Sequence, residues 1–356
     1  MKQLTNITDP IYTKPAAYTA LDRFLLRYIR DERDLPFVYL TLQITFTLWP
    51  LALLLYIPGL NNWVWWTVAI AYQFMNNVTF KGPFGLMLHC TSHRVFFDRK
   101  YQLLNHYLPW VIGPLFGQTP ETYYSHHIGM HHPENNMPED ESSTMAYQRD
   151  SFKGFMHYLW RFYWGGVYNL ACYFSRKKRK NLMVRSIRGE LFFIFACIGL
   201  SFVNFPATFV VFILPLLISR VIMMVGNWAQ HAFIDAADPD NAYKNSITCI
   251  NTKYNHKCWN DGYHISHHDK PNMHWTEHPI YFKKTLGLYI ENDAIVFDGI
   301  HFLHVWLWLV AKRYDLLAKH FVDIGGKYSS DEEIIAFLQS RTNPVTVVAE
   351  PTMAAA

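Results

Sequence analysis

The chain has 356 residues, of which 51% are hydrophobic, 17% are aromatic and only 17% are charged. A typical soluble domain carries roughly 25% charged residues, so this composition argues against a wholly soluble protein and favours one that is partly embedded in a membrane. The formal net charge of +4 is too small to indicate nucleic-acid binding. The five cysteines form no C-x-x-C pair, which fits a reducing compartment.

Residues 1–36 are mixed polar and charged, so we expect a cytoplasmic N-terminal segment without a cleavable signal. Four apolar segments follow that approach the length of about 20 residues needed to cross a bilayer. They are residues 37–60, 63–80, 191–205 and 207–225. Very short connectors join the first to the second and the third to the fourth. The sequence therefore predicts an all-α integral membrane protein with four transmembrane helices arranged as two hairpins.

Basic residues predict how these hairpins are oriented. Of the 32 Lys and Arg, 6 precede residue 37, 14 lie between residues 81 and 190, and 11 follow residue 226. Since cytoplasmic segments carry an excess of Lys and Arg, both termini and the long middle section should be cytoplasmic. Three further apolar stretches, 103–116, 155–174 and 305–311, are expected to lie in the membrane interface as amphipathic helices. Residues 286–341 should form interfacial or cytoplasmic helices, and residues 342–356 a disordered tail.

Histidines form three tight clusters outside the predicted spans. The first is His89-Cys-Thr-Ser-His93, the second is His126-His127-Ile-Gly-Met-His131-His132, and the third is His264-Ile-Ser-His267-His268. Imidazoles three or four residues apart share one face of a helix, so each cluster can direct its nitrogens at one point. Neutral imidazole is a common ligand for iron, copper, nickel and zinc. Eight such residues exceed what one tetrahedral zinc needs, so two metal ions sharing a cytoplasmic helical cap are predicted. These eight are His89, His93, His127, His131, His132, His264, His267 and His268.

Some polar neighbours can orient the imidazoles from outside the ligand shell. Asp261 and Asp269 flank the third cluster, and His126 is left as an outer or solvent residue because His127 places His131 four positions later. Taken individually, Asp261 and Asp269 are better interpreted as ordinary loop residues. The acidic stretch at residues 133–141 is expected to be a loop without a catalytic role.

These clusters resemble the three histidine boxes of the membrane fatty acid desaturase family, and the resemblance runs from about residue 40 to residue 285, so that residues 37–285 form one membrane di-iron domain. The run Gly262-Tyr-His-Ile-Ser-His-His-Asp-Lys-Pro271 is similar to the third box of that family. The element Asn227-Trp-Ala-Gln-His231 is similar to one in acyl-CoA desaturases, where the histidine is a further metal ligand and the asparagine holds a metal-bound water. By this match His231 joins the ligands and Asn227 lies beside them.

The resemblance implies a non-haem di-iron oxidoreductase that uses two iron ions, and O2 as co-substrate, to desaturate a long acyl chain by hydrogen-atom abstraction from adjacent methylenes. The same site can serve hydroxylation, ketolation or oxidative decarboxylation of a fatty acid or another lipid such as a carotenoid. A non-catalytic membrane metal-binding protein is the alternative of another class. The first box has three intervening residues where acyl-CoA desaturases usually have four, so a CoA thioester is not implied.

Electrons for such a reaction must come from an external donor. A fused cytochrome b5 module would show a His-Pro-Gly-Gly haem signature, and the sequence contains none. A separate ferredoxin or cytochrome b5 with its reductase is therefore the expected partner. Such carriers are often acidic, so a basic cytoplasmic face would favour their docking.

Overall fold

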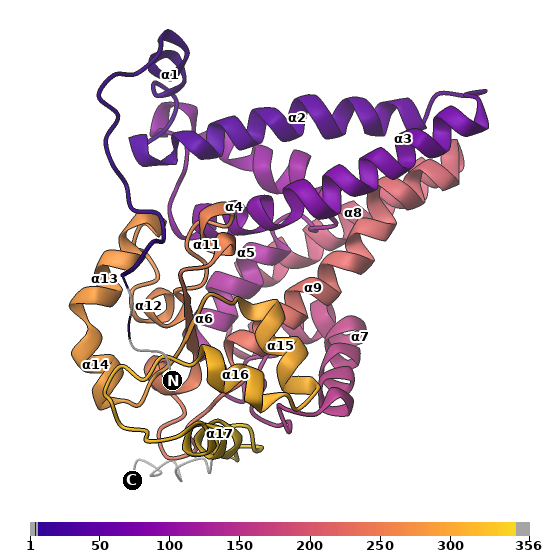
Figure 1. Ribbon diagram of the computed structural model, residues 1–356. Helices are drawn as coiled ribbons and strands as arrows, with labels where there is room; N and C mark the ends of the chain where they lie inside the picture. Colours follow the sequence, from indigo (N-terminus) through magenta and orange to yellow (C-terminus); the bar gives the residue numbers. More distant parts are fainter. Residues whose placement is uncertain (1–3, 5, 347–356) are drawn as a thin grey trace, which may run out of the picture.

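The computed structural model describes residue 4 and residues 6–346, and this part of the chain is predominantly helical (Figure 1). The helices are α1 Ala20–Leu25, α2 Leu35–Leu55, α3 Asn62–Phe74, α4 Lys81–His93, α5 Thr122–His126, α6 His132–Glu134, α7 Phe152–Arg176, α8 Lys180–Thr208, α9 Leu214–Gln230, α10 Ala242–Asn245, α11 Lys253–Lys257, α12 His264–Asp269, α13 His278–Lys284, α14 Leu286–Glu291, α15 Phe302–Val310, α16 Tyr314–His320 and α17 Asp331–Ser340. Single turns of 3-10 helix occupy Glu32–Asp34, Gly113–Phe116 and Trp275–Glu277, and a longer 3-10 segment occupies Arg99–His106. Segments of π-helix occupy Met75–Phe80, Leu108–Ile112, His127–His131 and Phe209–Ile213.

The prediction of an all-α fold is wrong in one detail, because a small parallel sheet lies in the cap. Strand β1 (Ile247–Ile250) pairs with β2 (Ile295–Asp298), and Ile247 is the partner of Ile295. All eight residues are buried or nearly so. Parallel strands require a long crossover connection, and here that connection contains α11 to α14 and hence the third histidine box. The pairing of β1 with β2 therefore holds together the two ends of the segment that carries the third box.

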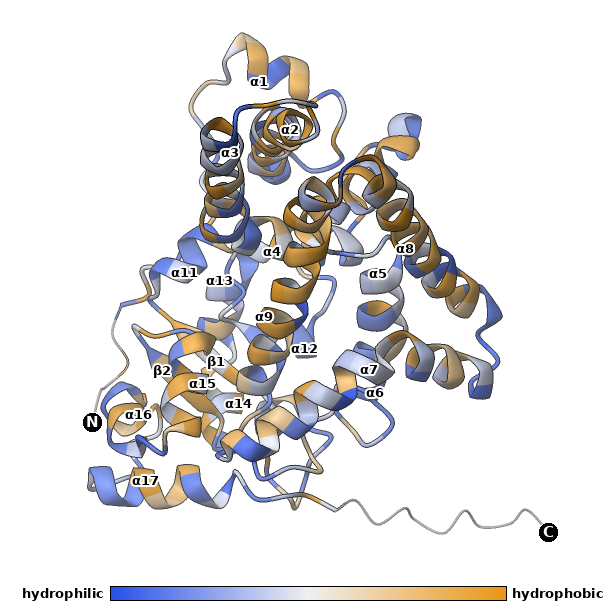
Figure 2. Cartoon of the chain, turned by 90° about the vertical axis from the view of Figure 1, so that its right-hand side faces the viewer, coloured by the Kyte–Doolittle hydropathy of each residue, from blue (hydrophilic) through white to orange (hydrophobic). Residues whose placement is uncertain are grey.

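The long helices extend together away from the cap. Figure 1 shows α2, α3 and α8 extending toward the same end of the molecule, whereas α11 to α17 gather at the other end. Two helical stretches are long and apolar enough to cross a membrane, Glu32–Leu55 and Lys180–Gln230. The second stretch is interrupted at Asn204, whose φ of −158° and ψ of 98° are not helical, two residues before Pro206. Figure 2 shows α8 and α9 as two arms that meet at one end.

Helix boundaries differ from the predicted spans in ways that matter for the site. The second predicted span ends at residue 80, but the helical backbone continues from α3 through the π-helical Met75–Phe80 into α4 as far as His93. The first histidine box is therefore the end of a helix that starts near the far end of the molecule. Similarly, α8 begins at Lys180, eleven residues before the third predicted span.

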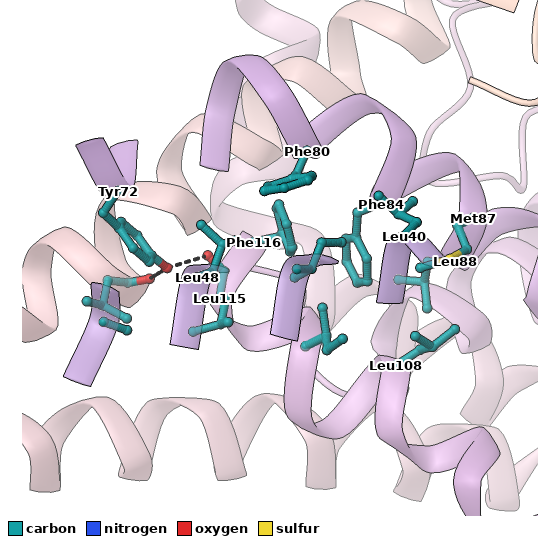
Figure 3. Close-up of a cluster of buried hydrophobic side chains, with 14 of the residues drawn as sticks. Leu40, Leu48, Tyr72, Phe80, Phe84, Met87, Leu88, Leu108, Leu115 and Phe116 are labelled. Atoms are coloured by element: carbon teal, nitrogen blue, oxygen red, sulfur yellow. Dashed lines mark hydrogen bonds between the residues drawn. The ribbon is translucent and has the colours of Figure 1, made fainter. Parts of the chain in front are cut away.

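The segment at residues 103–116 differs from its prediction as an interfacial helix. Leu103 and Leu104 are exposed, but Leu108, Ile112, Leu115 and Phe116 are buried against α2 and α4. Figure 3 shows Leu108, Leu115 and Phe116 inside this hydrophobic cluster, and the rings of Phe84 and Phe116 stack with centroids 4.3 Å apart.

The backbone groups of this buried segment find partners among the long helices. The Tyr72 hydroxyl lies within 3.3 Å of the Leu115 carbonyl and 3.0 Å of the Val211 carbonyl, and so links the segment to α3 and to the π-helical Phe209–Ile213 (Figure 3). The amide of Asn76 donates to the same Leu115 carbonyl over 2.8 Å. Because unpaired buried backbone groups are costly, these polar side chains explain how a loop-like segment can pack in an apolar core.

Helix α7 carries one continuous exposed apolar stripe. Phe152, Met156, Trp160, Trp164 and Tyr168 recur every four residues, and all five side chains are exposed. Residues four apart lie on one helix face, so the stripe is a single surface. Trp and Tyr are typical of membrane interfaces, so the stripe supports the interfacial position expected for residues 155–174, which stays a prediction.

The C-terminal region packs more tightly than predicted. Thr342 and Val345 are buried, and the backbone amide of Val345 donates to the Met145 carbonyl over 2.8 Å. The guanidinium of the buried Arg149 donates to the carbonyls of Arg341 and Asn343. The expected disordered tail is therefore wrong for residues 342–345, and its remainder from residue 347 lies outside the described residues.

Candidate metal centre

The elements that carry the histidine boxes end at one place in the cap. His89 and His93 lie one turn apart at the end of α4, and the third box forms the short helix α12. The second box spans the end of α5, the π-helical turn His127–His131 and the start of α6. His231 is the C-terminal cap of α9. Four separate parts of the chain therefore contribute imidazoles to the same region of the cap.

All nine predicted ligands come together in two adjoining groups. In each group the potential ligand atoms lie within 4.8 Å of one another. The first group is His89, His93, His127, His132 and His267, and the second is His131, His231, His264 and His268. The adjacent pairs His131-His132 and His267-His268 each contribute one residue to each group. Ring centroids of His132 and His268 are 4.9 Å apart, so the two groups touch.

Distances between imidazole nitrogens fit metal coordination. The Nε2 atoms of His89 and His267 are 2.9 Å apart, as are those of His132 and His267. In the second group the Nε2 atoms of His231 and His264 are 3.2 Å apart. With metal–nitrogen bonds of about 2.1 Å, two ligands at right angles around one ion lie about 3.0 Å apart. The observed spacing is therefore that of neighbouring ligands around a common ion.

Burial lowers the pKa of several of these imidazoles and so favours their neutral form, which is the form that binds metal. Burial is the main cause that lowers the pKa of His93 to about 2 and that of His231 to about 3, and neighbouring histidines add to the effect. The pKa values of His264, His267 and His268 are lowered well below the usual range for the same two reasons.

Two buried nitrogens of the second group lack hydrogen-bond partners within the described part of the chain. They are Nδ1 of His264 and Nε2 of His268. A buried imidazole nitrogen without a partner is costly in a folded protein, and a metal ion would satisfy Nε2 of His268. It would not satisfy Nδ1 of His264, because that ring already directs its Nε2 atom toward His231. The donor set, its spacing and the unpaired Nε2 atom of His268 all fit two iron ions held by nitrogen ligands.

The loop after the second box contributes a residue that the sequence interpretation missed. Asp140 is buried, and its Oδ2 atom lies 2.7 Å from Nδ1 of His131. The Ser142 hydroxyl donates to the other carboxylate oxygen over 2.7 Å. Although burial would raise the pKa of Asp140, the neighbouring His131 and these hydrogen bonds lower it. The expectation that this acidic loop plays no part in the site is therefore wrong for Asp140.

Other ligands are held by equivalent outer contacts. The Asp261 carboxylate lies 3.7 Å from Nδ1 of His89, as expected for an outer residue of the first group. Nδ1 of His231 donates to the Asn245 carbonyl over 2.9 Å. Such contacts fix the tautomer of an imidazole, so that Nε2 is free to face a metal ion.

The remaining predicted residues lie farther out. The Asn227 amide donates to the Ser142 carbonyl and to the Tyr158 hydroxyl, each over 2.8 Å. Asp269 accepts hydrogen bonds from Tyr243 and Tyr281, and so anchors the end of α12 rather than an imidazole. His126 belongs to neither group, and its ring is parallel to that of His131 with centroids 6.3 Å apart.

The other histidines of the described chain lie outside both groups. His274 pairs with the buried Asp34 over 3.0 Å, and His278 contacts the Ser266 hydroxyl at 2.8 Å from its Nδ1 atom. His278 therefore supports α12, which carries the third box, from its outer side.

Two cavities meet beside the first group. One has a volume of about 280 Å³ and runs between α4 and the segment 105–109, and the other has a volume of about 60 Å³ and runs between α5, α7 and α9. Gln118, Thr119 and Tyr123 line both cavities. The Tyr123 ring stacks on the ring of His127 with centroids 5.4 Å apart. None of the nine histidines lines either cavity, so a ligand that filled both would contact Tyr123 and would be separated from His127 by the ring of Tyr123.

Comparison with known protein families gives a match over most of the chain. The model of the family described as fatty acid desaturase matches residues 63–298, which is well over half of the chain and includes all nine histidines. No curated protein and no solved structure matches the sequence.

Proposed function

Because the chain belongs to the fatty acid desaturase family, whose members are oxidoreductases that act on lipids in membranes, we propose that it desaturates a long acyl chain at a di-iron centre held by the nine histidines. The observation that carries this proposal is the convergence of the nine imidazoles into two adjoining groups of five and four. Bound iron supplies the O2 chemistry that can remove hydrogen from unactivated methylenes, which no side chain of the protein can do by acid–base catalysis.

In this proposal the residues of the chain bind and orient. The first group would hold one iron and the second group the other, while Asp140 and Asp261 orient His131 and His89. Asn227 lies at the edge of the second group, where its contact with Tyr158 and with the Asp140 loop supports the ligands. The high degree of burial excludes bulk water, which protects a reactive oxidant from side reactions.

The acyl chain is proposed to occupy the two cavities that meet at Tyr123. Apolar side chains including Leu88, Val95 and Phe96 line the first cavity, and Phe162, Leu170 and Met223 line the second. A chain bent around Tyr123 would bring its middle to the ring that stacks on His127. In this arrangement, the distance from the opening of either cavity to Tyr123 would determine the position of the double bond in the acyl chain.

We also propose four membrane crossings, made by α2, by α3 with its π-helical extension, by α8, and by α9 with the π-helical Phe209–Ile213. Support comes from the break at Asn204, which divides the long stretch Lys180–Gln230 into two arms. It also comes from the placement of all three boxes at one end of these helices. Both termini and the site would be cytoplasmic, where a soluble ferredoxin, or a cytochrome b5 with its reductase, could deliver electrons.

Mass spectrometry of lipids and volatile hydrocarbons tests the proposed reaction. A host expressing the chain should accumulate an acyl product that lacks two hydrogens, and a His267→Ala variant should not. Iron content is measured in both proteins. A host without new lipid products is informative only if the site holds iron and an electron donor is active in that host. A product with added oxygen, or an alkene one carbon shorter, would keep the di-iron site and overturn desaturation.

A further inference from the structure

A second group of aromatic and histidine rings lies outside the metal centre. His320, Trp308, His304 and His301 follow one another from α16 through α15 to its N-terminal cap. The ring centroids of successive members are 5.4, 5.7 and 4.5 Å apart. All four side chains are partly exposed, so this row reaches the protein surface. We call these four residues, together with Tyr254, the ring row.

Tyr254 connects the ring row to the first group of metal ligands. Its ring stacks on that of His301 with centroids 4.7 Å apart and planes inclined by 13°. Its hydroxyl donates to Oδ2 of Asp261 over 3.1 Å, and the other oxygen of Asp261 lies 3.7 Å from Nδ1 of His89. An unbroken series of ring and polar contacts therefore runs from the surface to a predicted iron ligand.

Basic side chains surround the outer side of this series. Helix α11 has the sequence Lys-Tyr-Asn-His-Lys, and Lys253, His256 and Lys257 on either side of Tyr254 are all exposed. At the other end of the row, Lys319 precedes His320 and is also exposed. Helix α11 contains no acidic residue. The surface around the ring row therefore favours a negatively charged partner.

A second approach to the first group exists, but its charges are already balanced. A cavity beside His89 and His267 is lined by Asp34, His274 and Trp275. At its rim Arg33 forms ion pairs with Asp31 and Glu277, and Arg94 pairs with Asp31. This rim offers no surplus of charge of either sign, so it lacks the complementarity that the α11 surface has.

We propose that the α11 surface is the docking site of an acidic one-electron carrier, and that the ring row with Asp261 and His89 is the route by which its electrons reach the metal centre. This inference rests on the proposed function. Desaturation takes two hydrogen atoms from the acyl chain and reduces O2 to two waters, so two electrons and two protons must come from outside. Two reduced carriers are oxidised in turn, and solvent supplies the protons. The electrons tunnel through the contacts, and no side chain on the route is left oxidised.

Docking is tested on the metal-free protein, so the result does not depend on turnover. The probes are the soluble haem domain of cytochrome b5 and a plant-type [2Fe–2S] ferredoxin, each titrated against the full chain in nanodiscs. The double charge reversal Lys253→Glu with Lys257→Glu should raise the Kd of the better-binding carrier about ten-fold and reduce its salt dependence. The matched control is Lys283→Glu with Lys284→Glu on α13, another exposed lysine pair, and it should leave the Kd near that of the parent. Equal effects of both pairs, or no effect of the α11 pair, would overturn the docking site.

The route is tested by the rate at which a pre-reduced carrier loses its electron to the iron-loaded protein, followed by the absorbance of the carrier. Tyr254→Phe keeps the stack on His301 but removes the bond to Asp261, and His301→Ala removes the stack. Both should slow the transfer severalfold at saturating carrier, while reduction by dithionite stays unchanged and reports an intact metal site. His157→Ala, an exposed histidine on α7, is the control. Unchanged transfer in both variants would overturn the route, whereas carrier-driven reduction without any desaturated product would count against the proposed function alone.

Discussion

The Asp140 carboxylate lies 2.7 Å from Nδ1 of His131, and both side chains are buried. Nine positions separate the two residues, and the intervening loop turns back on itself through Asn135 and Asn136, both in the left-handed backbone region. A carboxylate that accepts a hydrogen bond from Nδ1 holds the imidazole in the tautomer whose Nε2 can bind metal, and makes it a stronger ligand. Asp140 is therefore a positioning residue for the second group.

We expect Asp140→Asn to weaken iron binding by roughly 10- to 100-fold, because outer partners of metal-bound histidines contribute about that much to affinity. The measurement is iron per protein by elemental mass spectrometry during titration with a competing chelator. Glu139→Gln is the matched control, since Glu139 is an exposed neighbour whose carboxylate pairs with Lys177. Equal iron affinity in Asp140→Asn and the parent would show that the contact is only structural.

The register of the second box gives a sharper test, because His126 and His127 are adjacent. His127 lies in the first group, with its Nε2 atom 2.9 Å from that of His93, whereas His126 lies in neither group. We expect His127→Ala to lose at least one of the two irons and all desaturation, and His126→Ala to keep both irons. Iron content and Mössbauer spectra of the two purified variants decide the question. Retention of both irons by His127→Ala, or loss of iron by His126→Ala, would mean that His126 and not His127 is the metal ligand.

The sequence predicted which histidines lie close together because their spacing is local. Residues four apart on a helix must share a face, so His89 and His93 could be paired without any knowledge of the fold. The position of His231 at the end of α9 carries no such signal, and only resemblance to the family indicated it. The structure brings His231 to within 3.2 Å of His264.

Long-range contacts explain what the sequence did not reveal. Asp140 resembles any other acidic loop residue until the loop is folded, although its H-x8-D spacing from His131 is a signal that could be sought in other chains. The segment around Leu115 has the composition of an interfacial helix, but polar groups of Tyr72 and Asn76 from distant helices allow it to be buried. The strands β1 and β2 are four residues long, too short for alternation to identify.

The N-terminal segment should stabilise the third box. The buried Asp9 accepts hydrogen bonds from the Tyr263 hydroxyl over 2.6 Å and from the Asn255 amide over 3.0 Å, and Tyr263 directly precedes His264. Asp9→Ala leaves the buried Tyr263 hydroxyl without this acceptor, at a cost of about 1–3 kcal/mol, whereas the Asn255 amide keeps its bond to the Cys249 carbonyl. We expect a lower melting temperature and weaker iron retention, measured by differential scanning fluorimetry and chelator titration. Glu332→Ala on the exposed side of α17 is the control, and equal melting temperatures of the two variants would contradict the role of Asp9.

The stability of the metal-free protein should depend on pH through His126. Burial lowers the pKa of this residue to about 4, and its Nε2 atom has no hydrogen-bond partner within the described part of the chain. Below pH 6.5 the unfolded chain takes up a proton at His126, while the folded chain does so only near pH 4. Stability is therefore lost as the pH falls from 6.5 to 4, by about 3 kcal/mol from this residue.

His126→Ala removes that loss while leaving the other buried histidines in place. The substitution leaves a cavity that lowers the free energy of unfolding at every pH, so only the slope of stability against pH is informative. Chemical unfolding of the metal-free parent and variant in micelles, at intervals between pH 7 and pH 4, should show a shallower decline for the variant. Parallel curves for the two proteins would mean that His126 gains a partner or a proton in the folded state, and that its burial as a neutral, unpaired imidazole is wrong.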